Sequence, residues 1–301
     1  MKHNFKITII LLAMFIITQL IGLAVVNWYT EKNLPYNMQP PADVTPEFSI
    51  ISIVTAFAIA IAVIFLLTKL KAKWFLRIWF FVVVIIALSI TLNSLFSYLT
   101  FPSTTLIAFV VALPLAFFKI FRQNLLVHNL TELMIYPGIA SVFVPILNVW
   151  TIILLLVAIS AYDIWAVWHT GFMQKMAKFQ IEHLKIFAGF FVPYAGKKEK
   201  KKIKTLKQKY KNQKIPEKIV KKSKIRISLA ILGGGDVVFP IIAAGIFLRT
   251  FNLLSALTIT FFASLALLGL FIAAKKGKFY PAMPFITSGI FIGMLISWIA
   301  F

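Results

Sequence analysis

Long uncharged apolar stretches recur along this 301-residue chain, and they restrict its fold more than any other feature. A helix needs roughly 20 mostly apolar residues to cross the hydrocarbon core of a bilayer. The sequence therefore predicts an all-α polytopic membrane protein, in which each such stretch is a transmembrane helix. The nine expected helices are residues 7–26, 48–67, 75–95, 106–118, 130–144, 147–167, 227–247, 254–274 and 285–301.

The composition supports this fold class. Sixty per cent of the residues are hydrophobic and only 13% are charged, whereas soluble domains average roughly 45–50% and 25%. A soluble fold with this composition would leave large apolar patches exposed to water. The first stretch is longer than the apolar core of a signal peptide, so we expect it to be a retained anchor. The chain contains no cysteine, which excludes disulfides, thiolate metal sites and a cysteine nucleophile.

The positions of Lys and Arg predict the orientation of the helices. Segments rich in positive charge alternate with segments that nearly lack it, and positive segments stay on the cytoplasmic side. We therefore expect a multi-pass protein of the cell membrane with a cytoplasmic N-terminus and an external C-terminus. The basic segments are residues 2–6, 69–73, 119–122, 169–226 and 275–278.

The longest connection, residues 169–226, carries 17 Lys and one Arg against three Glu, within a net charge of +22 for the chain. It divides the protein into residues 1–168, with six helices, and residues 227–301, with three. Residues 172–187 fit either an interfacial amphipathic helix or a continuation of the sixth helix. Residues 197–224 have the composition of a disordered tether and suit contact with anionic lipid headgroups. No nucleic-acid-binding module accompanies the charge, so nucleic acid is not an expected partner.

Two of the three aspartates, Asp163 and Asp236, lie inside apolar stretches. An ionisable side chain there costs at least roughly 2.5–3.5 kcal/mol on insertion scales, so it marks a functional site by default. The two residues lie on adjacent helices of opposite direction, where their carboxyl groups can meet. Two neighbouring carboxyl groups share one proton, and such a pair can act as general base and general acid in peptide hydrolysis.

Three glycines, residues 233–235, immediately precede Asp236. Glycine destabilises a helix by roughly 1 kcal/mol relative to alanine, and it allows a backbone or a substrate to approach closely. The glycine run therefore also permits a local break in the helix at this point. The alternatives are that the glycines form a helix-packing surface and that each aspartate is a structural group or a proton relay.

Three short motifs occur in order along the chain: Tyr162-Asp163, Gly233-Gly234-Gly235-Asp236 and Pro281-Ala282-Met283. In these motifs the chain resembles the presenilin and signal-peptide-peptidase family of intramembrane aspartyl proteases. That family carries Tyr-Asp in its sixth helix, Gly-x-Gly-Asp in its seventh and Pro-Ala-Leu before its ninth. Its nine helices and its long loop between the sixth and seventh are similar to the expected topology as well.

The resemblance implies that Asp163 and Asp236 are the catalytic residues and that no metal or other cofactor takes part. The residues that it implies as support for the active site are Tyr162, Gly233 and Gly235. The residues that it implies as positioning the substrate are Pro281, Ala282 and Met283. Substrates would be transmembrane peptides or membrane proteins.

The chain departs from the family pattern at Met283, where the family has leucine, and at Gly234, an unusual residue at the variable position. Methionine and leucine have similar volumes, so we expect the first change to have a small effect. The bacterial and archaeal members of the family work without accessory subunits, and the short loops of this chain leave little room for such subunits to dock. Homo-oligomerisation is left open by the sequence.

Other classes of membrane protein fit the sequence less well. No His-Glu-x-x-His zinc motif and no Gly-x-Ser-x-Gly motif occurs, and no histidine lies within an expected helix. Glu132 lies at an edge of the fifth expected helix. A secondary transporter or ion channel, with the two aspartates as proton or cation ligands, remains the alternative. Against this alternative, the sequence shows no evident inverted repeat of the kind that many transporters have.

The segment before the ninth expected helix contains two prolines, Pro281 and Pro284. Proline lacks an N–H group and fixes its own φ, so we expect an extended segment here. The backbone groups of Ala282 and Met283 would then have no helical partners. An unwound substrate could pair with them by strand addition.

Overall fold

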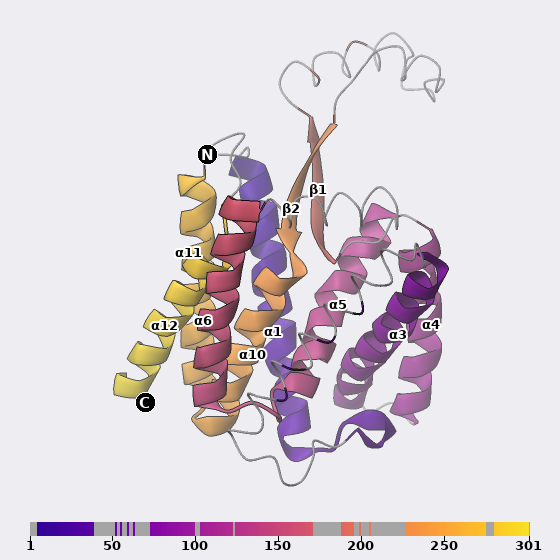
Figure 1. Ribbon diagram of the computed structural model, residues 1–301. Helices are drawn as coiled ribbons and strands as arrows, with labels where there is room; N and C mark the ends of the chain where they lie inside the picture. The colour runs from indigo at the N-terminus through magenta and orange to yellow at the C-terminus, as the bar shows by residue number, and fades with distance from the viewer. Residues whose placement is uncertain are drawn as a thin grey trace.

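The structure, a computed structural model, describes residues 5–38, 73–99, 103–122, 124–170, 188–195, 227–274 and 280–300, with single positions at residues 52, 55, 59, 63, 199 and 205. Within these ranges it is a bundle of long helices with a two-stranded sheet at one end (Figure 1). Three expected segments lie outside the described residues, apart from those single positions. They are residues 48–67, 172–187 and 197–224.

The described helices follow most of the expected apolar stretches. They are α1 (Phe5–Glu31), α3 (Lys73–Tyr98), α4 (Thr104–Phe121), α5 (Leu125–Phe143), α6 (Val149–Trp165), α10 (Gly234–Thr250), α11 (Leu253–Ala273) and α12 (Met283–Ala300). A 3-10 turn, η1 (Pro35–Asn37), follows α1, and a π-helical turn, η2 (Ala166–Thr170), extends α6. Within the described ranges, six helices are long and apolar enough to cross a membrane: α1, α3, α4, α6 with its extension, α11 and α12.

The seventh expected helix is wrong over its first seven residues. Ile227–Gly233 forms strand β2, which pairs antiparallel with β1 (Gly189–Ala195) of the long loop, in a register that places Gly189 opposite Gly233. Hydropathy cannot separate a short apolar strand from a helical turn, whereas the alternating burial along β2 is typical of a strand. Ala230 and Leu232 are buried, while Leu229 and Ile231 are each 39% exposed.

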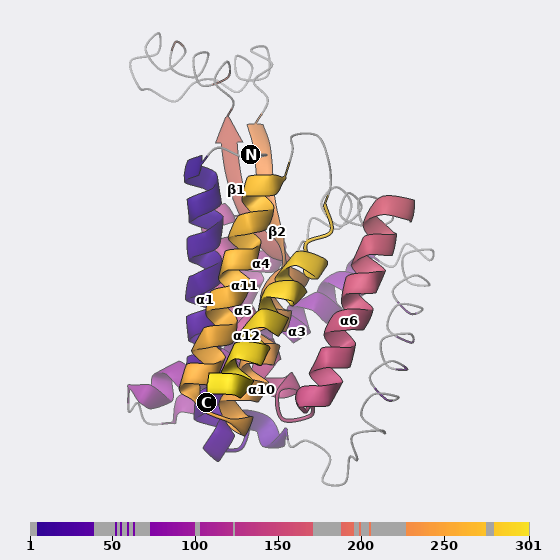
Figure 2. The ribbon, with the colours of Figure 1, turned by 90° about the vertical axis from the view of Figure 1, so that its left-hand side faces the viewer.

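The packing of the helices places both ends of the chain around a shared core. α1 packs against α5, α10 and α11, and α12 lies between α11 and α6 (Figure 2). α3 and α4 form a second layer that contacts the rest of the bundle mainly through α5. The larger core therefore encloses the strand–helix junction between β2 and α10, and helices from both halves of the sequence surround it.

Candidate active site

Asp163 lies in the last turn of α6, before the helix passes into its π-helical extension. Its side chain is 4% exposed, and its Oδ2 accepts a hydrogen bond of 3.0 Å from the backbone N–H of Met283. The backbone N–H of Ala282 is directed at the same carboxyl group. A hydrogen bond of 2.8 Å between Ser160 and Thr287 joins α6 to α12 one turn away. The start of α12 is therefore fixed against Asp163.

Asp236 lies in the first turn of α10, directly after the strand–helix junction. The expected helix of residues 227–247 would have placed Asp236 in its middle, which is wrong because β2 replaces the first part of that helix. Its carboxyl group accepts a hydrogen bond from the backbone N–H of Gly233. Free N–H groups and the positive end of the helix dipole favour an acceptor at this position.

The three glycines before Asp236 have different surroundings. A Cβ atom added at Gly234 would lie 2.8 Å from the hydroxyl oxygen of Tyr136 on α5, and one at Gly233 would lie 3.1 Å from Oδ2 of Asp236. A Cβ at Gly235 would make only ordinary contacts, 3.8 Å from the ring of Phe239. Of the three glycines, Gly234 therefore has the least space for a side chain. It stands at the position that is variable in the family pattern.

The structure brings Asp163 and Asp236 together from two different helices, close enough for their charges to interact. Both recorded ion pairs of the described residues involve Glu132, and neither involves these aspartates. No group of three or more His, Asp or Glu side chains among the described residues is placed to hold a metal ion.

The segment from Pro281 to Met283 differs in part from its expected form. α12 begins at Met283, and the carbonyl of Ala282 already accepts a helical hydrogen bond of 3.1 Å from the N–H of Ile286. The expectation that Ala282 has no helical partner is therefore wrong for its carbonyl. The N–H of Met283 is engaged by Asp163.

Tyr162 precedes Asp163 on α6 and is 42% exposed, and its ring centroid lies 6.3 Å from that of Trp165. Its side chain therefore lies on an outer face of α6, while that of Asp163 is buried.

One neighbour of the site was not expected from the sequence. The side chain of Gln19 on α1 is fully buried, and its Nε2 donates a hydrogen bond of 2.9 Å to the carbonyl of Val237, the residue after Asp236. This bond joins α1 to the first turn of α10. A polar residue in the middle of an expected transmembrane helix is the signal that could have indicated it.

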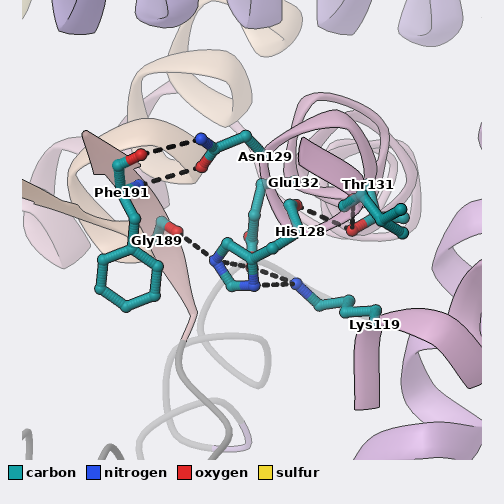
Figure 3. Close-up of polar contacts among 8 residues, drawn as sticks. Lys119, His128, Asn129, Thr131, Glu132, Gly189 and Phe191 are labelled. Carbon is teal, nitrogen blue, oxygen red and sulfur yellow. Dashed lines mark hydrogen bonds and ion pairs between the residues drawn. The ribbon is translucent and has the colours of Figure 1, made fainter. Parts of the chain in front are cut away.

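A second group of polar residues lies between α4, α5 and β1 (Figure 3). We call Lys119, His128, Asn129 and Glu132 the α4–α5 polar cluster. Lys119 forms an ion pair with Glu132, and both side chains are almost completely buried. The fifth expected helix began too late, because α5 starts at Leu125 and thus contains His128 as well as Glu132. The two-stranded sheet of β1 and β2 is called the hairpin below. His128 and Asn129 of the cluster hydrogen-bond to the edge of β1 that faces away from β2.

Comparison with known proteins identifies the family. The family described as signal-peptide peptidase, presenilin aspartyl protease matches residues 12–301. Among solved structures, a presenilin family intramembrane aspartate protease in space group C222 has a TM-score of 0.63 at 16% identity, over 97% of this chain and 98% of that chain. The same description in space group P2 has a TM-score of 0.61 at 16% identity, over 96% of both chains. No curated protein matches the chain.

The chain belongs to the presenilin and signal-peptide-peptidase family, and it is an intramembrane aspartyl protease. Its fold is that of the presenilin-family structures, with which it shares nearly its whole length. The transporter or channel alternative finds no support in these matches.

Proposed function

We propose that Asp163 and Asp236 form the catalytic dyad of this protease. The observation that carries the proposal is that α6 contacts α10, which brings Asp163 near enough to Asp236 for their charges to interact, without an ion-pair partner for either among the described residues. Like charges at close range favour a state in which one proton is shared by the pair. One carboxylate is then ready to accept a proton while its neighbour is ready to donate one.

In the proposed reaction a water molecule attacks the carbonyl carbon of the scissile peptide bond. The ionised aspartate takes a proton from that water, and the protonated aspartate gives its proton to the carbonyl oxygen. The tetrahedral intermediate then collapses as the C–N bond breaks. The leaving nitrogen takes a proton from the carboxyl group that received one. A hydroxyl of the intermediate gives its proton back to the other carboxylate as the new carbonyl forms, so the pair again shares one proton.

Substrates are proposed to be single transmembrane segments that unwind before cleavage, because helical carbonyls are occupied by bonds within the segment. The N–H of Met283 is already bonded to Asp163, so the segment before α12 offers little to an incoming strand. β2 has more backbone groups for pairing, because the N–H and C=O groups on its edge away from β1 are not used within the sheet. This strand ends directly before the helix turn that carries Asp236. An unwound substrate that pairs with this edge would be led to the dyad.

The proposed membrane arrangement has nine transmembrane helices, a cytoplasmic N-terminus and an external C-terminus in the cell membrane. In Figure 1 the start of α1 and the hairpin lie at one end of the bundle, and the C-terminal end of α12 lies at the opposite end. The basic segments after α4 and before β2 then share the cytoplasmic side with the hairpin. The loop of residues 169–226 is proposed to contact anionic lipid headgroups, and no accessory subunit is required.

The test uses purified protein in detergent with a single-span peptide, with and without a transition-state inhibitor of aspartyl proteases. We expect cleavage that the inhibitor abolishes. We also expect a bell-shaped pH profile, because activity requires one proton on the pair rather than none or two. Cleavage that resists the inhibitor and is flat between pH 4 and pH 8 would reject the dyad.

A further inference from the structure

The two strands of the hairpin differ in how their outer edges are covered. In an antiparallel pair, the residues of a non-hydrogen-bonded pair direct their N–H and C=O groups away from the partner strand. Phe191 directs both groups away from β2, so its partner Ile231 directs its own groups away from β1. The same alternation places Gly189 and Pro193 with Phe191 on the outer edge of β1.

Asn129 occupies this outer edge at Phe191. Its Nδ2 donates to the carbonyl of Phe191 at 2.8 Å, and its Oδ1 accepts from the N–H of Phe191 at 3.0 Å (Figure 3). These are the two hydrogen bonds that a residue of a neighbouring strand would make. The carboxamide of Asn129 therefore takes the place of a third strand at this point.

The neighbouring positions of the same edge are closed as well. His128 Nε2 lies 2.8 Å from the carbonyl oxygen of Gly189, and Lys119 Nζ lies 3.4 Å from His128 Nδ1. Lys119 is fixed in turn by its ion pair with Glu132. Pro193 has no N–H group to offer, which is a usual means of protecting a sheet edge. The backbone of β1 thus has little left with which to bind another extended chain.

β2 is different. At the end where β2 meets α10, the pairing of the two chain segments continues by one more bond. The N–H of Gly234 donates to the carbonyl of Ala188, just before β1, at 3.3 Å. Within the described part of the chain, however, no side chain or strand makes a recorded hydrogen bond to the outward groups of Leu229 and Ile231. An unprotected edge is a template for strand addition.

We propose that Asn129 is a positioning residue that closes the outer edge of β1, so that an unwound substrate can pair only with the edge of β2 that leads to Asp236. His128 supports it at Gly189. This inference rests on the proposed function, because it concerns the path by which a substrate reaches the dyad. Asn129 acts through the hairpin and does not touch the reacting atoms.

The test compares Asn129→Leu with Asn129→Gln and with the matched control Asn93→Leu. Asn93 is also an asparagine that joins helices by two hydrogen bonds, 2.9 Å to Tyr29 and 3.0 Å from Thr105, but it lies on α3 away from the hairpin. All four proteins are purified in detergent and assayed with one single-span peptide. The readouts are KM, kcat per folded molecule, the cleaved bonds identified by mass spectrometry, and hydrogen exchange of residues 189–195.

In Asn129→Leu we expect KM to rise by about tenfold, since two buried hydrogen bonds are lost. Cleavage should spread to neighbouring bonds and exchange of residues 189–195 should increase, while kcat changes little. Asn129→Gln, which keeps both polar groups, should lie between wild type and Asn129→Leu. Asn93→Leu should lower thermal stability without changing KM or the cleaved bond.

Two results would overturn the inference: unchanged exchange of residues 189–195 in Asn129→Leu, or increased exchange with an unchanged KM and cleavage pattern. Failure of the proposed function has a different signature, because wild-type cleavage would then persist in Asp163→Asn and Asp236→Asn.

Discussion

The protein contains two acidic sites that are built in opposite ways. Glu132 on α5 faces Lys119 of α4, and the two side chains are 1% and 5% exposed. Asp163 and Asp236 lie near enough for their charges to interact, and their hydrogen-bond partners among the described residues are backbone N–H groups. A cation neutralises the first site, whereas only dipoles support the second. The comparison shows that burial of an acid alone does not identify a catalytic group.

The difference lies in what remains available for reaction. A carboxylate that is paired with a buried ammonium group is held by the strong cost of separating the charges. A carboxyl group that is held by an amide dipole and faces a second carboxyl group can exchange its proton. We therefore expect substitutions at the first site to act on stability and substitutions at the second to act on turnover.

The largest expected effect is that of Asp163→Asn or Asp236→Asn. Each should reduce peptide cleavage by roughly 10²–10⁴-fold, because one carboxyl group cannot serve as both acid and base. Thermal unfolding in detergent should stay close to that of wild type, because asparagine has the same size. Glu132→Gln is the control acid, and its folded fraction should keep its turnover. Near wild-type turnover in either aspartate variant would show that the aspartate site is not the catalytic one.

The next effect concerns Lys119→Met. Removal of one partner leaves the buried charge of Glu132 uncompensated, which should destabilise the protein by about 3–5 kcal/mol in an SDS unfolding titration. The double variant Lys119→Met with Glu132→Leu should recover most of that loss, because an apolar pair replaces the ion pair. If Lys119→Met instead lowered turnover per folded molecule without loss of stability, the first site would take part in the reaction.

A smaller effect is expected where the two sites touch. Tyr136 lies one turn after Glu132 on α5, and its hydroxyl fills the space beside Gly234. Gly234→Ala should therefore cost about 1–3 kcal/mol through overpacking and displace the start of α10. Gly235→Ala is the matched control, because its Cβ would meet no atom closer than 3.8 Å. Equal unfolding curves and equal turnover for the two variants would contradict this.

The smallest expected effects concern the segment before α12. Pro281→Ala frees the backbone that directs the Met283 N–H to Asp163, so we expect turnover per folded molecule to fall by about tenfold. Met283→Leu keeps the N–H group and should be near neutral or mildly activating. Turnover and folded fraction are measured on the same preparation. A stability loss with unchanged turnover in Pro281→Ala would show that the proline only ends a loop.

Local sequence patterns were sufficient to single out the two aspartates of the proposed dyad. Asp163 and Asp236 stand out because a charge inside a transmembrane stretch is costly. The glycines indicated only that a break was permitted before Asp236, and the expected helix ran through them. The kind of break was missed. Residues 227–233 are as apolar as a helix, and their partner strand lies beyond a long basic loop.

The α4–α5 polar cluster was missed for a related reason. Hydropathy counts His128 and Glu132 as evidence against a membrane helix, so the expected helix began after one and placed the other at its edge. Their compensation by Lys119 and by the backbone of β1 arises only from tertiary contact. Long-range pairing of this kind cannot be read from local sequence.

The hydrogen bond between Met283 and Asp163 joins residues 120 positions apart, and this separation has a consequence for biosynthesis. When a ribosome has just added Asp236, both acidic side chains of the proposed dyad exist, yet the amide that holds Asp163 has not been made. At roughly 5–20 residues per second, several seconds pass before Met283 is added. The nascent chain is therefore expected to reach full activity only after its last helix has been made.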